Sequence, residues 1–521
     1  MATQIQDRSR QTALPSVAGS SALRRSGSRK TEILERFLLP RASIKERMAA
    51  GKELRKRVPR SDHARHLPPR SRPDPVEILI EQARTRIPRL VPLRYARMLA
   101  SPFAFLRGAA AIMASDLRRT PVTGLKVQAC GDMHLVNFGI FASAERNLIF
   151  GINDFDETLT GPWEWDVKRL AASVFVCVRS LGGSKALGDD AVRATVASYR
   201  TRLREYAELG HIQLWYSRID ERAVLAALAS HPQSQARAKQ YFNQARKHTN
   251  LQVLDRLTAI VADRRRIVED RPLIVRETRT ADGLPILEAL DLVLRSYVPT
   301  LNEDRRRLLS QYQILDVARK VVGVGSVGLA CWVAFFRGCR DDDPLFLQVK
   351  EAQPSVLASY GGLKAHLENE GRRVVEGQRL IQGAPDIFLG WGQVGRFQLY
   401  VRQLRDMKGG IELDPETAHV EMLPDYCALC GWALALAHAR SGDAAAIAGY
   451  AGTSEALDDA LVKFARAYAD QTERDFEWLV KAARQRRIPV ARVHKPQRSA
   501  KPVSKRRKSR RPSKKIRKLS R

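Results

Sequence analysis

The stretch Val127–Ser173 constrains the fold of this chain more than any other, because acidic and amide side chains separate short apolar runs there. It reads VQACGDMHLVNFGIF, then LIFGINDFDET and GPWEWDVKRLAAS. The apolar runs FGIF and LIFGI predict the two strands of a β-hairpin. This hairpin would bring the loop that contains Asp132 and Asn137 close to the acidic segment Asn153–Glu157. We therefore expect several carboxylates to converge beside one amide.

Such a cluster of carboxylates suffers like-charge repulsion unless a cation or a proton lies within it. Mg²⁺ suits this place, because it takes one or two carboxylates together with phosphate oxygens. The segment GDMHLVN, which begins at Gly131, resembles the catalytic loop of the aminoglycoside-phosphotransferase branch of protein-kinase-like enzymes. The segment NDFD, which begins at Asn153, is similar to their metal-binding acidic motif, and Trp165-Asp166-Val167 resembles the segment that follows it.

This resemblance implies that Asp132 is the base that orients or deprotonates an acceptor hydroxyl group. It also implies that Asn137 and Asp154 hold Mg²⁺ beneath the phosphates of ATP, with Asp156 as a further candidate ligand. Asp166 would support the loop.

Some residues depart from the family pattern or have more than one interpretation. Cys130 stands where these enzymes usually have histidine, and Glu157 adds a further carboxylate to the cluster. His134 is either a neutral histidine packed behind the loop or a residue that contacts phosphate. Three arginines before the loop are interpreted as solvated or structurally paired, namely Arg94, Arg97 and Arg107.

A second informative stretch, GVGSVG, extends from Gly323 through Gly325 to Gly328 and lies between two strand-like runs. A Rossmann glycine turn would open a helix, so these glycines instead predict a hairpin whose backbone can approach phosphates closely. The strand that follows the next turn reaches Lys350. The three strands resemble the first strands of a kinase amino-terminal lobe, which implies that the glycines and Lys350 bind the triphosphate.

A helix is predicted over Leu363–Gln382, after the strand that carries Lys350. The same resemblance implies that one of its carboxylates pairs with this lysine, with Glu376 as the first candidate and Glu370 as the second. Two further strands follow, and Phe397–Leu404 would carry the hinge against which the adenine stacks.

The glycine-loop segment follows the catalytic-loop-like segment, which is the reverse of the order in ordinary kinases. We therefore predict an α+β, protein-kinase-like two-lobe fold with permuted lobe order, in which a mainly helical larger lobe accompanies a small antiparallel sheet lobe. The expected parts are a flexible basic arm, a helical lobe, a β lobe, a helical return to the larger lobe and a disordered basic tail, at residues 1–75, 76–310, 311–410, 411–483 and 484–521.

The formal net charge of +33 belongs mainly to the two ends of the chain. Residues 1–75 contribute +11 and residues 484–521 contribute +18, which leaves only +4 for the part between them. Closely spaced lysines and arginines neutralise phosphate groups whatever the base sequence. The composition of the two ends therefore predicts non-specific binding to nucleic acid or another polyanion. A solubilising role for the tail is an open alternative.

Six scattered cysteines favour a reducing cytoplasm over a secreted disulfide framework. Cys427 and Cys430 are interpreted as core residues on one helix face. No run of about 18 apolar residues is found, so we expect no insertion into a membrane.

The favoured function is an ATP- and Mg²⁺-dependent phosphotransferase with an unknown acceptor. One alternative is a catalytically inactive nucleotide-binding scaffold whose basic tails bind nucleic acid or another polyanion, and another is a structural protein without a nucleotide site. The stretch from about Arg60 to about Asp470 also resembles a bacterial family known only as a domain of unknown function.

Overall fold

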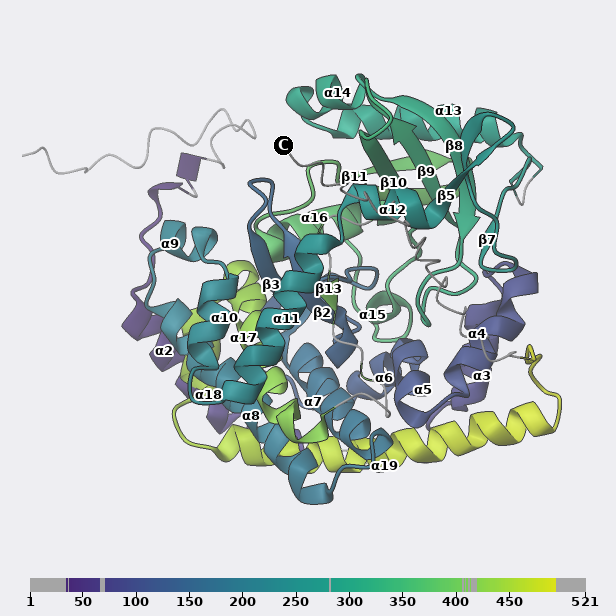
Figure 1. Ribbon diagram of the computed structural model, residues 1–521. Coiled ribbons are helices and arrows are strands. Elements are labelled where there is room, and N and C mark those ends of the chain that lie inside the picture. Colours follow the sequence, from purple (N-terminus) through teal and green to yellow (C-terminus); the bar gives the residue numbers. More distant parts are fainter. Residues whose placement is uncertain are drawn as a thin grey trace, which may run out of the picture.

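The computed structural model describes residues 34–35, 37–65, 71–280, 283–404, 407, 409–410, 413 and 419–492. Within them the protein is α+β, with its largest sheet at one end and most of the long helices at the other (Figure 1). The predicted fold class is confirmed at this level. The predicted basic tail lies outside the described residues from residue 493 onward.

The largest sheet has six strands in the order β11–β12–β10–β9–β8–β7, and all neighbouring strands are antiparallel. The central strand β10 reads PLFLQVKE and is buried along its whole length, which explains its apolar composition. The strands predicted around and after the glycine loop are all present. The bounds are β7 (Ile274–Val275), β8 (Gln313–Lys320), β9 (Cys331–Arg337), β10 (Pro344–Glu351), β11 (Gly390–Val394) and β12 (Phe397–Gln403).

Several helices pack on this sheet or connect its strands. Helix α16 begins where the Asn369 side chain accepts a hydrogen bond from the backbone of Arg372, and it ends at Gly383, whose φ is 61°. On α13, Tyr297 donates a hydrogen bond to the backbone oxygen of Phe388, at 2.6 Å. The bounds are α12 (Asn250–Leu257), α13 (Ile286–Tyr297), α14 (Glu303–Leu309), α15 (Val356–Ser359) and α16 (Glu370–Gln382).

The helical part contains the longest helices, and α17 lies at its centre. Gly431 lets α17 approach α8, because a Cβ atom there would lie 2.1 Å from the backbone oxygen of Thr195. Cys427 and Cys430 on α17 are buried, which confirms their interpretation as core residues. The bounds are α7 (Trp163–Ser180), α8 (Lys185–Ala207), α9 (His211–Tyr216), α10 (Glu221–Ala227), α11 (Pro232–Lys247), α17 (Leu423–Ser441), α18 (Ala444–Ala451) and α19 (Ala456–Arg484).

The segment Val420–Ser441, which includes α17, is long and apolar enough to cross a membrane by length and composition alone. However, 67% of this apolar window is buried inside the protein. Such burial is typical of a core helix, and it explains the apolar composition without a membrane.

Three small antiparallel sheets complete the strands. The pairing of Phe138 with Ile152 confirms the predicted hairpin of β2 and β3, and β1 pairs with β4 beside it. The bounds are β1 (Lys126–Ala129), β4 (Leu159–Pro162), β2 (Phe138–Ala142), β3 (Leu148–Ile152), β13 (Gly409–Gly410), β5 (Thr258–Val261) and β6 (Arg264–Ile267). Short 3-10 helices are η1 (Leu54–Lys56), η2 (Arg60–Ala64), η3 (Pro88–Leu90), η4 (Leu135–Asn137), η5 (Val298–Thr300) and η6 (Val420–Met422).

Part of the arm that was predicted to be flexible is helical, because α2, η1 and η2 lie within residues 44–64. Ser43 and Glu46 form a capping box that opens α2. Arg55 then donates hydrogen bonds to the backbone oxygens of Gly449 and Tyr450 on α18. The remaining early helices are α2 (Ile44–Glu53), α3 (Pro75–Ala83), α4 (Val91–Met98), α5 (Pro102–Gly108) and α6 (Ala110–Leu117).

Candidate active site

The loop after β1 carries Asp132. Asp166, in the first turn of α7, stabilises this loop through hydrogen bonds to its backbone. The Asp166 carboxylate accepts hydrogen bonds from the backbone N–H groups of Cys130, at 2.6 Å, and Gly131, at 3.0 Å. Gly131 has a φ of 80°, and a Cβ atom there would lie 2.4 Å from the backbone oxygen of Glu157. Glycine is therefore required at this position. The predicted supporting role of Asp166 is confirmed.

Asn137 ends η4 and is oriented by the same loop. Its side-chain Nδ2 donates a hydrogen bond to the backbone oxygen of Asp132, at 2.6 Å, so its Oδ1 atom remains a possible ligand. The backbone oxygen of Asn137 accepts from the N–H of Asn153, at 2.8 Å, which ties the loop to the end of β3. Asp154 follows directly, so Asp132, Asn137 and Asp154 converge as predicted.

Arg169 on α7 is the ionic partner of Asp132. Its Nε atom donates a hydrogen bond to Oδ1 of Asp132, at 2.8 Å, and its Nη2 atom donates a second one to the same oxygen. Burial raises the pKa of the Asp132 carboxyl, although Arg169 opposes this change. The other carboxylate oxygen, Oδ2, lies 3.8 Å from Nε2 of His134. Burial lowers the pKa of His134 far below its ordinary value, so this histidine is neutral and does not form an ion pair.

Asp156 connects the acidic segment with the sheet, because the Nζ atom of Lys350 forms an ion pair with its carboxylate. Tyr400 on β12 donates a hydrogen bond to Oδ1 of Asp156, at 2.6 Å, and Ser326 of the glycine loop donates to Oδ2, at 3.1 Å. Burial opposes ionisation here, but the ammonium group of Lys350 lowers the pKa of Asp156 to about 2. Two segments that are 194 residues apart in sequence therefore share this site.

Among the described residues, Asp154 forms no ion pair with a lysine or arginine, whereas Asp156 pairs with Lys350. Burial and the neighbouring charge of Asp156 both raise the pKa of the Asp154 carboxyl, and the more distant Lys350 and Arg402 oppose this only in part. A carboxylate in this environment would be stabilised by a bound cation.

The expected pair of Glu376 with Lys350 does not form. Glu376 pairs with Arg372 one turn earlier, at 2.6 Å, and its side chain is 42% exposed. The second candidate, Glu370, pairs with Arg373. The sequence shows only where these carboxylates lie along the helix. The orientation of α16 in the folded protein turns Glu376 toward solvent, and Lys350 instead pairs with Asp156 from another segment.

Arg373 is the residue through which α16 contacts the site. It is 3% exposed, and it donates hydrogen bonds to three backbone oxygens, those of Asp156, Thr158 and Gln353, at 2.6–2.9 Å. No local pattern distinguishes Arg373 for this role, because Arg372 and Arg379 lie on the same helix. Arg373 thus fixes the acidic segment against the end of β10.

The glycine loop is held by one arginine from the segment between α3 and η3 and by one from α4. Nη1 of Arg86 donates hydrogen bonds to the backbone oxygens of Gly325, at 2.7 Å, and Val327, at 2.5 Å. Arg97 donates to the backbone oxygen of Gly323, and the N–H of Ile87 donates to that of Gly328, at 2.8 Å. Arg97 is thus structurally paired, as predicted.

A cavity of about 120 Å³ lies where these parts meet. Gly328 and Lys350 are not among its lining residues, and Lys350 acts on it through Asp156. The volume is below the 300–1,000 Å³ that is common for whole small-molecule ligands, so it suits a phosphate group and a metal ion better than an entire nucleotide. The predicted residues that line it are Asp132, His134, Asn137, Asp154, Asp156, Glu157, Gly323 and Gly325.

Arg107 on α5 also lines this cavity, and here the sequence interpretation differs from the structure. Its buried Nε atom has no hydrogen-bond partner among the described residues. Burial lowers the pKa of the Arg107 guanidinium, while the charges of Asp132 and Asp154 oppose that change. Arg94, in contrast, is fully buried and donates to the backbone oxygens of Leu79 and Gly108, which confirms its structural role.

Described segments of the chain pack on the Lys350 side of the sheet, next to the predicted adenine hinge. Leu404, which follows β12, packs there with Val253 and Leu254 of α12 and with Ile267 of β6. Segments of this chain therefore cover the surface on which an adenine was expected to stack.

The comparisons with known proteins agree with the predicted bacterial family. The sequence pattern of one family matches residues 86–482, which is more than half of the chain. No curated protein and no solved structure matches the chain. On the strength of this long match, the protein belongs to the family described as an uncharacterized protein conserved in bacteria (DUF2252).

Proposed function

We propose that this protein is an ATP- and Mg²⁺-dependent phosphotransferase with an acceptor that has still to be identified. The observation that carries the proposal is the convergence of Asp132, Asn137 and Asp154 with the glycine loop around one cavity. Phosphoryl transfer needs positioning and charge neutralisation more than covalent chemistry, and a compact cluster of carboxylates, an amide, arginine and glycine backbone can supply both.

The donor set fits Mg²⁺. Within the described ranges, no group of three or more His, Cys, Asp or Glu side chains is arranged to hold a metal ion. A metal here would therefore take Oδ1 of Asn137 and the carboxylate of Asp154, and it would complete its shell with water and phosphate oxygens. When bound, Mg²⁺ neutralises charge on the transferred phosphoryl group. The buried Asp154 carboxyl supports this assignment, because burial and the charge of Asp156 raise its pKa and a bound cation would stabilise its ionised form.

Asp132 is proposed as the group that accepts the proton of the acceptor hydroxyl. Arg169 holds Oδ1, which leaves Oδ2 to face the cavity side on which neutral His134 lies. Because burial raises the pKa of Asp132, this carboxylate is a stronger base than an exposed aspartate. We assign the binding of phosphoryl oxygens to Arg107, whose buried Nε has no partner in the described part of the chain.

The strand and helix order supports a kinase-like arrangement with permuted lobes. Strands β8, β9 and β10 follow one another antiparallel, Lys350 lies on β10, and α16 precedes β11 and β12. The catalytic-loop-like segment comes earlier in the chain yet lies against the same sheet. The small cavity and the covered adenine surface imply that α12 or its surroundings must move before a whole nucleotide binds.

The first test measures the unfolding temperature with and without Mg²⁺-ATP for the wild type, Asp154→Ala and Lys350→Ala. A ligand at 100 times its Kd should stabilise the folded protein by about 2.7 kcal/mol. We expect a shift in the wild type that both variants lose. Arg119→Gln, at an exposed arginine, is the control and should keep the shift. The absence of a shift in the wild type at millimolar Mg²⁺-ATP would contradict nucleotide binding.

A second test separates the enzyme from an inactive nucleotide-binding scaffold. Asp132→Asn and Arg107→Gln should abolish slow ATP hydrolysis or phosphoryl transfer, and Asp132→Asn should retain the Mg²⁺-ATP shift. Binding without turnover in the wild type would favour the scaffold, whose basic tails are then proposed to bind nucleic acid or another polyanion.

A further inference from the structure

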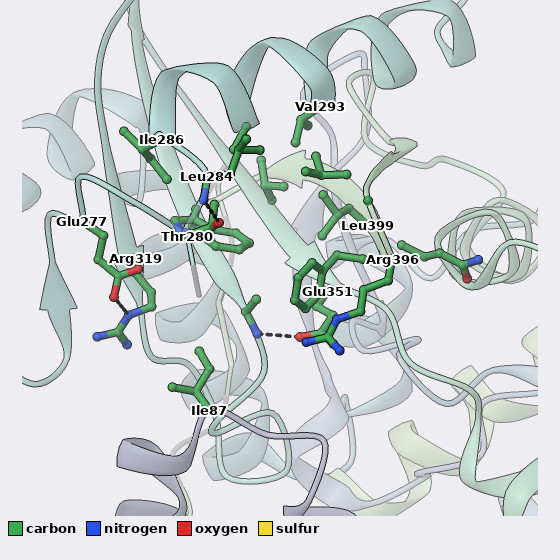
Figure 2. A pocket seen from close by; sticks show the side chains of 18 of the residues that line it. Ile87, Glu277, Thr280, Leu284, Ile286, Val293, Arg319, Glu351, Arg396 and Leu399 are labelled. Atoms are coloured by element: carbon green, nitrogen blue, oxygen red, sulfur yellow. Dashed lines mark hydrogen bonds and ion pairs between the residues drawn. The ribbon is translucent and has the colours of Figure 1, made fainter. Parts of the chain in front are cut away.

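A second pocket, of about 1820 Å³, lies on the other face of the six-stranded sheet (Figure 2). Successive side chains of a strand point to opposite faces. Val349 and Glu351 accordingly line this pocket, whereas Lys350 between them reaches Asp156. Helix α13 covers one side, and residues 84–89 close the other. The pocket therefore lies on the opposite face of the sheet from the Lys350–Asp156 pair. It adjoins the candidate active site, because Arg86 and residues 351–354 line both cavities.

The two ends of this pocket differ in polarity. Figure 2 shows Ile286 and Val293 on the α13 side, with Leu399 nearby on the sheet. At the opposite end, Arg319 on β8 pairs with Glu277, at 2.8 Å. A ligand that fits both ends must have an apolar body and a polar head.

The charge of the lining indicates the sign of that head. Eight arginines and four glutamates line the pocket, which leaves an excess of positive charge. Three of the four glutamates have partners: Glu277 pairs with Arg319 and Arg89, and Glu370 pairs with Arg373. Glu351 accepts a hydrogen bond from the backbone N–H of Ala330, at 2.9 Å. The lining is thus complementary to an anion.

Two buried donors in this lining lack an acceptor. Arg319 is 3% exposed, and its Nη1 atom has no hydrogen-bond partner among the residues that the structure describes. The indole Nε1 of Trp332, on the neighbouring strand β9, lacks one as well. A buried donor without a partner costs roughly 1–3 kcal/mol. Both groups can only donate, so the missing partner is an acceptor.

We propose that this pocket binds a small amphipathic carboxylate, with its apolar chain beneath α13 and its carboxylate at Arg319 and Trp332. A carboxylate offers two acceptor oxygens, which matches two unpartnered donors on adjacent strands. This site does not depend on the proposed phosphotransferase function, because none of the residues assigned to that function lines it.

The test uses the full chain and decanoate as the probe, with decanol and decyl phosphate as comparisons, in isothermal titration calorimetry. We expect decanoate to bind at least ten times more tightly than decanol, which has the same chain without the charge. Tighter binding of decyl phosphate than of decanoate would overturn the assignment to a carboxylate.

Three variants locate the binding. Arg319→Gln should reduce decanoate binding to the level of decanol, and Trp332→Phe, which removes the indole donor and keeps an aromatic ring of smaller size, should weaken it several-fold. Ala289→Trp, on the pocket side of α13, should abolish binding of both probes by filling the apolar end. Arg295→Gln is the matched control on the same helix, because its side chain is 75% exposed and pairs with Asp291.

The proposal is overturned if decanoate and decanol bind equally, or if the preference for decanoate survives in both Arg319→Gln and Trp332→Phe. It is also overturned if Ala289→Trp, folded as shown by its circular dichroism, binds decanoate like the wild type.

Discussion

The ion pair between Lys350 and Asp156 provides the sharpest test of the arrangement, because it joins segments that are 194 residues apart. The perturbation is a double-mutant cycle of Lys350→Met, Asp156→Asn and the combined variant. If the two segments lie together as described, these side chains are coupled, and the effects of the single changes do not add.

The size of the coupling follows from burial. The two side chains are 3% and 18% exposed. At a separation of about 3 Å and an effective dielectric constant of about 20, the attraction is about 5.5 kcal/mol. The cost of removing Lys350 from water offsets part of this attraction. When the lysine is replaced, Tyr400 and Ser326 still donate hydrogen bonds to Asp156, which reduces the net effect further. We expect each single substitution to lower the free energy of unfolding by about 3 kcal/mol, and we expect the interaction energy from the double-mutant cycle to be about 2 kcal/mol.

The assay is urea unfolding followed by tryptophan fluorescence, with the free energy of unfolding extrapolated to water. A parallel cycle on Arg372 and Glu376 serves as the matched control, because this pair is exposed and lies one turn apart on α16. Its coupling should not exceed about 0.5 kcal/mol. A Lys350–Asp156 coupling as small as that of the control would refute the convergence of the two segments.

Three further predictions concern single residues. Asp154→Asn should leave the metal-free protein as stable as the wild type or more stable, because burial and the charge of Asp156 disfavour the ionised Asp154 carboxylate more than Lys350 and Arg402 favour it; a lower unfolding temperature in calorimetry would argue against this. Burial raises the pKa of Glu157 from 4.5 to about 7, so the folded protein binds more protons than the unfolded chain between these values and loses stability as the pH rises. Glu157→Gln should remove this loss, which is at most about 3 kcal/mol, in urea unfolding at pH 5 and pH 8. Arg373→Met should cost about 3 kcal/mol because three backbone oxygens lose their donor, whereas Arg372→Met should cost less than about 0.5 kcal/mol, and equal effects would refute the assigned roles.

Local patterns determined much of the fold. The alternation of apolar runs with acidic residues was enough to predict the hairpin of β2 and β3, and with it the approach of Asp154 to Asn137. The glycine-rich turn and the apolar strand that carries Lys350 could also be predicted from the sequence, because strand periodicity and turn formation depend on residues that are neighbours in the sequence. The capping box at Ser43 is a local signal of the same kind, because it depends on a glutamate three residues later.

Only the tertiary structure decided which distant side chains meet. In the folded protein, Lys350 pairs with Asp156 rather than with Glu376. Arg107 lines the cavity, and α12 packs over the surface on which adenine was expected to stack. The sequence determined the strands beside the acidic segment and the glycine loop, the helix that ends at Gln382 and the cluster of carboxylates, since each follows from spacing within a short segment. The partners of those carboxylates depend on the docking angle of whole elements, and local spacing contains no information about that angle.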